Sequence, residues 1–301
     1  MKADMDSLSS HAQLPNTLQY TAKTSRGDYL IQVAWPQQWS ADRVPHDERP
    51  VNTLYVVDGN AYFYTAVDIT RRLEFTNAAR TVVVAIGYPP SRYVYDWRRG
   101  PDLTPPCEEY DMPLDSHGNP RTDLTFGEAD KYLGFIEQDC ITHVEGTLFR
   151  HVQLGRRALY GHSYGGIFSL STLFTRPETF ETIIAASPVV WWNKDHLTKV
   201  LEPSFTSRND MNRPVSLIMA WGSMKQDTIQ EDGESEEDYK TRVSNAEDDK
   251  MRDSVTALGQ RLRDCRNVRR VAMKELDGED HGSAAVAGLQ YGIRQFLFGR
   301  V

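Results

Sequence analysis

The feature that most constrains the fold of this chain is a glycine-flanked serine, Ser163, in the run Gly161-His162-Ser163-Tyr164-Gly165-Gly166. A short run, 157–160, ends just before it, and the apolar run 167–174 follows. This context predicts a buried strand that turns sharply into a buried helix. Such a turn exposes the serine hydroxyl, where a neighbouring base can activate it. Ser163 is therefore the candidate nucleophile.

Strands and helices alternate along the rest of the chain. Continuous apolar runs at 53–57, 81–86, 182–187 and 216–221 are typical of parallel strands covered on both faces, and residues 268–276 suit a last strand. Apolar residues recur at helical spacing in three series, which are Leu133, Ile136, Cys140 and Val144; Met251, Val255, Leu258 and Leu262; and Val286, Leu289, Ile293 and Phe296. Residues 17–36 alternate around a turn and predict a hairpin. We expect an α/β fold: a mainly parallel sheet with helices on both faces and an N-terminal antiparallel hairpin.

Composition limits the partners and the compartment. The 301 residues carry a formal net charge of −8, which argues against nucleic acid as a partner. The chain has no run of about eighteen apolar residues, so we expect no transmembrane helix and no membrane partner. The first residues are polar and lack the apolar core of a secretion signal, and the three cysteines form no C-x-x-C pair. A cytoplasmic protein with reduced thiols is the expectation.

We expect a loose leader at 1–16 and a single domain that spans 17–301. Within this domain, two long segments depart from the alternation of strands and helices. Residues 87–127 are rich in Pro, Gly, Asp and Arg and show no clear period. Irregular segments of that length usually carry function, so this one is expected to line a site. Residues 226–250 form the second segment, an expected acidic loop, with ten acidic and three basic residues between 227 and 250.

The base that activates the serine is expected to be His281. In a strand–turn–helix architecture of this kind the acid and then the histidine follow the serine along the chain. Only His196 and His281 lie after Ser163, and His196 comes too early to leave room for a strand that carries the acid. His281 lies in a turn-rich run between the last predicted strand and the last helix, from which its imidazole can reach the serine.

The acid of the triad is less well determined by the sequence. It should follow the strand that ends at Gly222, and Asp227 is the first carboxylate there. Glu231, Asp232 and Glu234 follow closely and are alternatives. In a third arrangement no carboxylate contacts His281, and a backbone carbonyl orients a Ser–His pair, since the acid mainly fixes the tautomer and stabilises the imidazolium.

Two backbone N–H groups are expected to form the oxyanion hole. One belongs to Tyr164, directly after the nucleophile. The other belongs to Asn60, in the run Asp58-Gly59-Asn60 that follows the first central strand. Each such donor contributes about 3 kcal/mol of transition-state stabilisation.

Two tryptophans, Trp191 and Trp192, are adjacent in the sequence. One ring suits the core and the other, Trp192, suits the wall of a substrate pocket.

The sequence contains no pattern that calls for a cofactor. It has no H-E-x-x-H, no paired metal-ligand spacing, no P-loop and no G-x-G-x-x-G after a strand. We therefore expect catalysis without a metal or an organic cofactor.

Six motifs occur in a fixed order, and together they resemble a known family. They are Asp58-Gly59-Asn60-Ala61, Gly87-Tyr88-Pro89, Arg99-Gly100-Pro101-Asp102-Leu103-Thr104-Pro105, the Ser163 motif, Ser187-Pro188 with Trp191-Trp192, and Asp280-His281-Gly282-Ser283. The chain resembles the α/β-hydrolase esterases that open siderophore lactones, namely the bacterial enterobactin-type esterases and the fungal triacetylfusarinine C esterase. The resemblance extends from about residue 17 to residue 298.

The resemblance implies a serine esterase of the α/β-hydrolase fold that cuts the ester bonds of a macrocyclic trilactone, free or as its iron complex. It implies Ser163 as nucleophile, His281 as base, the amides of Asn60 and Tyr164 as oxyanion donors, and Arg99 as a substrate-binding residue. The chain departs from the pattern at Lys225, where related sequences often carry a glutamate. That departure bears on the acid and on the substrate.

Other functions use the same residues. An acyltransferase, a thioesterase or a lactone-forming enzyme of secondary metabolism would share the machinery, because water and an alcohol compete for one acyl-enzyme. A non-catalytic homologue that only binds its ligand is a further alternative. The expected function is carboxylic ester hydrolysis of a triacetylfusarinine C-like siderophore.

Overall fold

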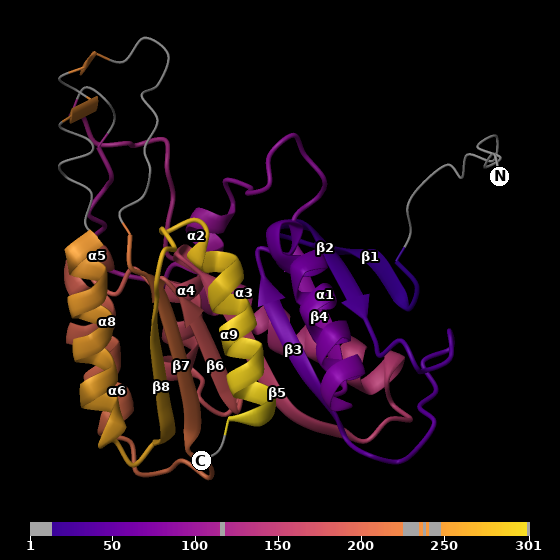
Figure 1. Ribbon diagram of the computed structural model, residues 1–301. Coiled ribbons are helices and arrows are strands. Elements are labelled where there is room, and N and C mark those ends of the chain that lie inside the picture. Colours follow the sequence, from indigo (N-terminus) through magenta and orange to yellow (C-terminus); the bar gives the residue numbers. More distant parts are fainter. Residues whose placement is uncertain (1–13, 115–117, 225–234, 237–238, 241–247, 300–301) are drawn as a thin grey trace, which may run out of the picture.

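A computed structural model describes residues 14–114, 118–224, 235–236, 239–240 and 248–299 (Figure 1). Its centre is an eight-stranded sheet with the order β1-β2-β4-β3-β5-β6-β7-β8. The first two strands pair antiparallel, β2 pairs antiparallel with β4, and all later neighbours pair parallel. The expected mainly parallel sheet with an N-terminal hairpin is confirmed. The strands are β1 (Thr17–Thr24), β2 (Gly27–Ala34), β3 (Val51–Val57), β4 (Thr81–Gly87), β5 (Leu154–His162), β6 (Thr182–Ala186), β7 (Val215–Gly222) and β8 (Val268–Leu276).

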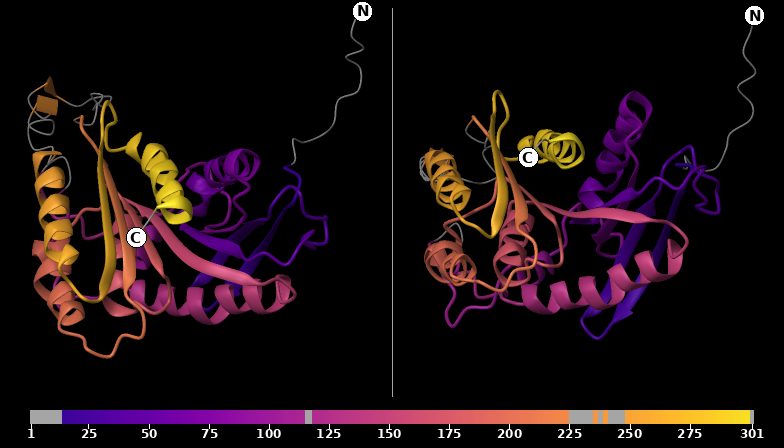
Figure 2. Two further views of the ribbon diagram at one scale, coloured as in Figure 1. Left: turned by 60° about the horizontal axis from the view of Figure 1, so that its bottom comes forward. Right: turned by 90° about the horizontal axis from the view of Figure 1, so that it is seen from below.

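Helices cover both faces of the sheet, and Figure 2 shows helices on its two sides. On one face α1 packs on β4, and α9 packs on β6 and β7. On the other face α4 packs on β5 and β6, and α8 packs on β8. The helices are α1 (Gly59–Asn77), α2 (Arg99–Leu103), α3 (Ala129–Phe135), α4 (Tyr164–Thr175), α5 (Trp192–His196), α6 (Glu202–Thr206), α8 (Asp248–Arg263) and α9 (Ala284–Phe298), with π-helical segments η1 (Ile136–Ile141), η2 (Val144–Leu148) and η3 (Leu197–Leu201). None of the helices within the described ranges is long and apolar enough to cross a membrane.

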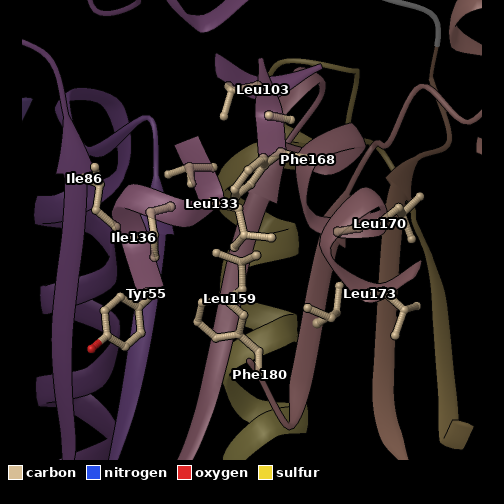
Figure 3. Close-up of a cluster of buried hydrophobic side chains, with 14 of the residues drawn as sticks. Tyr55, Ile86, Leu103, Leu133, Ile136, Leu159, Phe168, Leu170, Leu173 and Phe180 are labelled. Carbon is tan, nitrogen blue, oxygen red and sulfur yellow. The ribbon is translucent and has the colours of Figure 1, made fainter. Parts of the chain in front are cut away.

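The largest hydrophobic cluster among the described residues lies between the sheet and the α3–α4 side, and Figure 3 shows part of it. Leu159 of β5 contributes to this layer together with Phe168 of α4 and Leu133 of α3. All seven residues of β4 are buried, which is why its sequence shows a continuous apolar run rather than an alternation. Both predicted series at 133–144 and 251–262 are buried throughout.

One predicted core position is wrong. Val286 was expected on the buried face of the last helix, but its side chain is 49% exposed. Leu289, Ile293 and Phe296 of the same series are buried, as expected. Val286 lies in the first turn of α9, but the residues of that turn that face the sheet are Ala284 and Ala285, which are buried. Its spacing of three from Leu289 therefore places it near the buried stripe but not in it.

The parallel strands all end at the same edge of the sheet, the upper edge in Figure 1. Asp58, Tyr88, Ser163 and Ser187 each follow directly after one of these strands. His281 lies in the turn between β8 and α9, at the same edge. Residues that lie far apart in the sequence therefore meet there, as expected for a site at the carboxyl ends of parallel strands.

The burial difference along α9 gives a first prediction. Leu289→Ala should lower the free energy of unfolding by about 2–5 kcal/mol, because it leaves a cavity in a fully buried layer. Val286→Ala, on the same helix, should change it by no more than about 0.5 kcal/mol. Urea denaturation followed by circular dichroism measures both. Equal losses in the two variants would contradict the assigned orientation of α9.

Candidate active site

Ser163 lies between β5 and α4 with φ 57° and ψ −114°, an unusual conformation for a residue with a side chain. Its N–H donates to the carbonyl of Ala186 at 3.0 Å, and its own carbonyl accepts from the N–H of Ile167 at 3.0 Å. A side chain at Gly161 would collide with the backbone of Gly165, so this position must be glycine. The predicted sharp turn with the serine at its apex is therefore present.

Asn60 is held by the neighbouring strand end. Its side-chain amide donates to the carbonyl of Tyr88 at 2.9 Å and accepts from the N–H of Tyr88 at 2.7 Å. The N–H groups of Asn60 and Tyr164 lie in the first turns of α1 and α4, where backbone donors lack partners within their helix. This position suits both for the predicted oxyanion hole.

His281 lies beside the Ser163 turn. The ring of His162, the residue before the nucleophile, is 4.9 Å from the ring of His281 between centroids. The Nε2–H of His162 donates to the backbone carbonyl of His281 at 2.7 Å. The structure therefore brings together the two residues that the sequence predicts as nucleophile and base, although 118 positions separate them.

The turn that carries His281 is well held. Asp280 and Ser283 bond reciprocally, with the N–H of Ser283 donating to Asp280 Oδ1 at 2.6 Å and the N–H of Asp280 donating to Ser283 Oγ at 3.0 Å. The bond from the Ser283 N–H, and after it the Ser283 hydroxyl, lower the pKa of the Asp280 carboxyl. Asp280 is thus engaged in shaping the turn.

The predicted acid, Asp227, lies outside the described residues, as do Glu231, Asp232, Glu234 and Lys225. The described chain before them runs next to the His281 turn. The N–H of Met224 donates to the carbonyl of Glu279 at 2.9 Å, and the N–H of Ser223 donates to that of Leu276 at 3.0 Å. Gly222 packs so closely on the carbonyl of Glu279 that no side chain would fit. The strand expected to precede the acid, β7, therefore ends against the turn that carries His281. The acid itself stays a prediction.

Arg99 forms an ion pair that the sequence did not reveal. Its guanidinium donates to both carboxylate oxygens of Asp58, at 3.1 Å and 2.9 Å, and the Asp58 side chain is only 1% exposed. Burial alone would lower the pKa of Arg99, but the charge and hydrogen bonds of Asp58 raise it above its ordinary value. The guanidinium also lies over the rings of Tyr95 and Tyr164, at 4.7 Å and 5.2 Å. Arg99 therefore joins the α1 turn to the Ser163 turn.

An aromatic cavity of about 520 Å³ opens beside this ion pair. Its wall comes from two stretches of the segment 87–127, which the sequence predicted to line a site, and from Tyr164 next to the nucleophile. Its lining includes Tyr93, Tyr95, Trp97, Arg99, Phe126 and Tyr164.

Trp192 lies one layer behind this cavity. Its ring contacts Phe126 at 6.2 Å and Tyr110 at 6.1 Å, measured between centroids. It is not among the residues that line the cavity. The expected pocket wall at Trp192 is thus an aromatic support for Phe126, which itself faces the cavity.

The wall segment is anchored to the sheet rather than loosely attached. Buried Asp102 of α2 accepts from the hydroxyl of Tyr29 at 2.9 Å and pairs with Arg26. Arg98 donates to the carbonyl of Asp28 at 2.8 Å.

Among the described residues, no group of three or more His, Cys, Asp or Glu side chains is arranged to hold a metal ion.

Comparison with known proteins identifies the family. Residues 22–281 match the family described as "Putative esterase". The chain is 39% identical to the siderophore enterobactin esterase of Emericella nidulans over 89% of this chain and 88% of that protein. It is 35% identical to the siderophore triacetylfusarinine C esterase of Aspergillus fumigatus over 94% of each.

A solved structure agrees with these matches. The siderophore hydrolase EstA from Aspergillus nidulans superposes with a TM-score of 0.88 at 36% identity, over 98% of each chain. The turn at Ser163, the nearby His281 and the sheet order are what an esterase of this architecture requires. The chain belongs to this esterase family, and it is a carboxylic ester hydrolase with the α/β-hydrolase fold.

Proposed function

We propose that this protein hydrolyses the ester bonds of a siderophore macrolactone through an acyl-enzyme on Ser163. The observation that carries the proposal is the contact between the two turns, in which His162 holds the backbone of His281 beside the nucleophile. The names of the fungal relatives, which act on siderophores, support the substrate class.

In the proposed reaction His281 takes the proton of the Ser163 hydroxyl as its oxygen attacks the ester carbonyl. The negative charge that develops on the carbonyl oxygen is stabilised by the N–H groups of Asn60 and Tyr164. Collapse of this intermediate releases the alcohol, which receives the proton from His281. Water then attacks the acyl-enzyme by the same route, and the hydroxy acid leaves. Asp227 is the proposed partner that orients His281.

The cavity favours an uncharged siderophore. Its wall is mostly aromatic, and the charged residues among its described lining, Arg99 and Asp96, both have partners of opposite charge. Arg99 is paired with Asp58, and Asp96 accepts from the N–H of Arg98 at 2.8 Å and lies 3.4 Å from its guanidinium. Three hydroxamates neutralise a ferric ion, whereas three catecholates leave a trianion, whose burial without a cation is costly. We therefore propose a triacetylfusarinine C-like trihydroxamate ester as substrate.

The proposed cellular location is the cytoplasm, where reduced thiols are stable. It is supported by Cys107, Cys140 and Cys265, which are all free. The strained backbone at Ser163 also supports catalysis over ligand binding alone, because a binder has no use for that strain.

The nucleophile is tested by Ser163→Ala. We expect kcat to fall by about 10⁴-fold or more, because the acyl-enzyme cannot form, while substrate affinity changes little. Mass spectrometry of the products from ferric triacetylfusarinine C measures turnover, and a fluorophosphonate probe should label the wild type but not Ser163→Ala. Ser204→Ala, at an exposed serine, is the matched control. Turnover that survives in Ser163→Ala would refute the assignment.

The substrate class is tested by comparing two iron complexes. We expect kcat/KM for ferric triacetylfusarinine C to exceed that for ferric enterobactin by about tenfold or more. Raising the ionic strength should leave kcat/KM for ferric triacetylfusarinine C almost unchanged, because this uncharged complex forms no ion pair with the protein.

A variant of the cavity wall makes this comparison sharper. Leu124 lines the cavity, so Leu124→Lys adds a cation there and should shift the preference towards the trianion. Leu124→Met is the neutral control. A wild-type preference for the trianion, lost at high salt, would contradict the proposed substrate and leave the esterase mechanism standing.

A further inference from the structure

A row of hydrogen bonds runs from the cavity wall to the backbone of His281. The hydroxyl oxygens of Tyr95 and Tyr62 are 2.6 Å apart, and the hydroxyl of Tyr62 is 3.0 Å from His162 Nδ1. His162 Nε2 is 2.7 Å from the carbonyl of His281. Tyr95 belongs to the wall segment, Tyr62 to α1, and His162 to the end of β5. Four separate parts of the chain are thus joined in one line.

The direction of each bond follows from chemistry. A carbonyl oxygen only accepts, so the proton of His162 must lie on Nε2. Burial, and then the neighbouring His281, lower the pKa of His162 to about 3, so its imidazole is neutral and has a single N–H. Nδ1 must therefore accept, and the hydroxyl of Tyr62 donates to it. Because that hydroxyl has one proton, the oxygen of Tyr62 accepts from Tyr95.

We propose that Tyr95, Tyr62 and His162 are positioning residues that hold the His281 backbone, and with it the base, beside Ser163. The inference rests on the proposed role of His281. Tyr62 and His162 are only 3% and 5% exposed, so the two inner bonds are shielded from water. Bonds from Ser223 and Met224, directly after β7, reach residues 276 and 279, whereas the bond from His162 reaches His281 itself.

Tyr62→Phe tests the central bond. It keeps the ring, which packs edge-on against Tyr160 at 5.6 Å, and removes the hydroxyl. His162 Nδ1 then loses its donor, the imidazole can carry its proton on either nitrogen, and the wrong tautomer cannot donate to His281. We expect kcat to fall by about tenfold with KM within about threefold, as for a misplaced catalytic group.

Two further variants show whether the effect follows the hydrogen bonds. Tyr64→Phe removes a hydroxyl from the same helix at a 62% exposed position, and it should leave kcat unchanged. Tyr95→Phe leaves the bond from Tyr62 to His162 intact, so kcat should fall by only about two- to threefold. Tyr95 is 42% exposed, so this variant is expected to fold even where Tyr62→Phe does not. A larger loss in Tyr95→Phe than in Tyr62→Phe, or an equal loss in Tyr64→Phe, would overturn the proposal.

Nitrogen-15 NMR of the histidine rings gives a readout that does not depend on activity. In the wild type we expect His162 as the Nε2–H tautomer, with no titration between about pH 5 and 8, and in Tyr62→Phe a mixture of tautomers. An Nδ1–H tautomer or a protonated ring in the wild type at neutral pH would refute the proposed bonds. The expected tautomer together with full turnover in His281→Ala would instead refute the proposed function.

Discussion

The site depends on one strained residue, Ser163. A side chain at φ 57° and ψ −114° costs on the order of 1–3 kcal/mol, so its surroundings must hold it in place. Bonds to Ala186 and Ile167 fix Ser163 from β6 and from α4, and the absence of a side chain at Gly161 lets α4 begin directly above β5. The buried layers on both faces of the sheet keep these strands in register, so the stability of the core offsets the cost of the strained turn.

Local patterns predict most of the fold. Continuous apolar runs gave the central strands, because strands covered on both faces have no polar side to reveal. The glycine-flanked serine gave the strand–turn–helix at its centre, since few other structures accept that spacing. The misplaced Val286 shows the limit of such reasoning. Periodicity defines a stripe along a helix but not its exact edges: in the first turn of α9 the small Ala284 and Ala285 are buried, and the larger Val286 is exposed.

Only part of the site can be predicted from the sequence. Ser163, His281, Asn60 and Tyr164 follow from motif order, and the structure places them at one edge of the sheet. The pairing of Asp58 with Arg99 joins residues 41 positions apart, and no local period records such a contact. The one signal for Asp58 was its place between a buried strand and a glycine. The role of His162 was hidden in the variable position of the serine motif, where its bond to His281 depends on tertiary packing. The acidic run offered several equivalent carboxylates, so charge alone could not choose among them.

The Asp58–Arg99 ion pair has a consequence for how this enzyme can evolve. It ties one residue of the wall segment firmly to the turn that precedes α1, whereas Tyr93, Val94 and Trp97, a few positions earlier, carry largely exposed side chains. Selection can therefore exchange those exposed residues, and with them the shape of the cavity, while Arg99 keeps the segment in place. The constraint on chemistry and the freedom in substrate choice fall on different residues of the same short segment, so new specificities can arise without rebuilding the nucleophile.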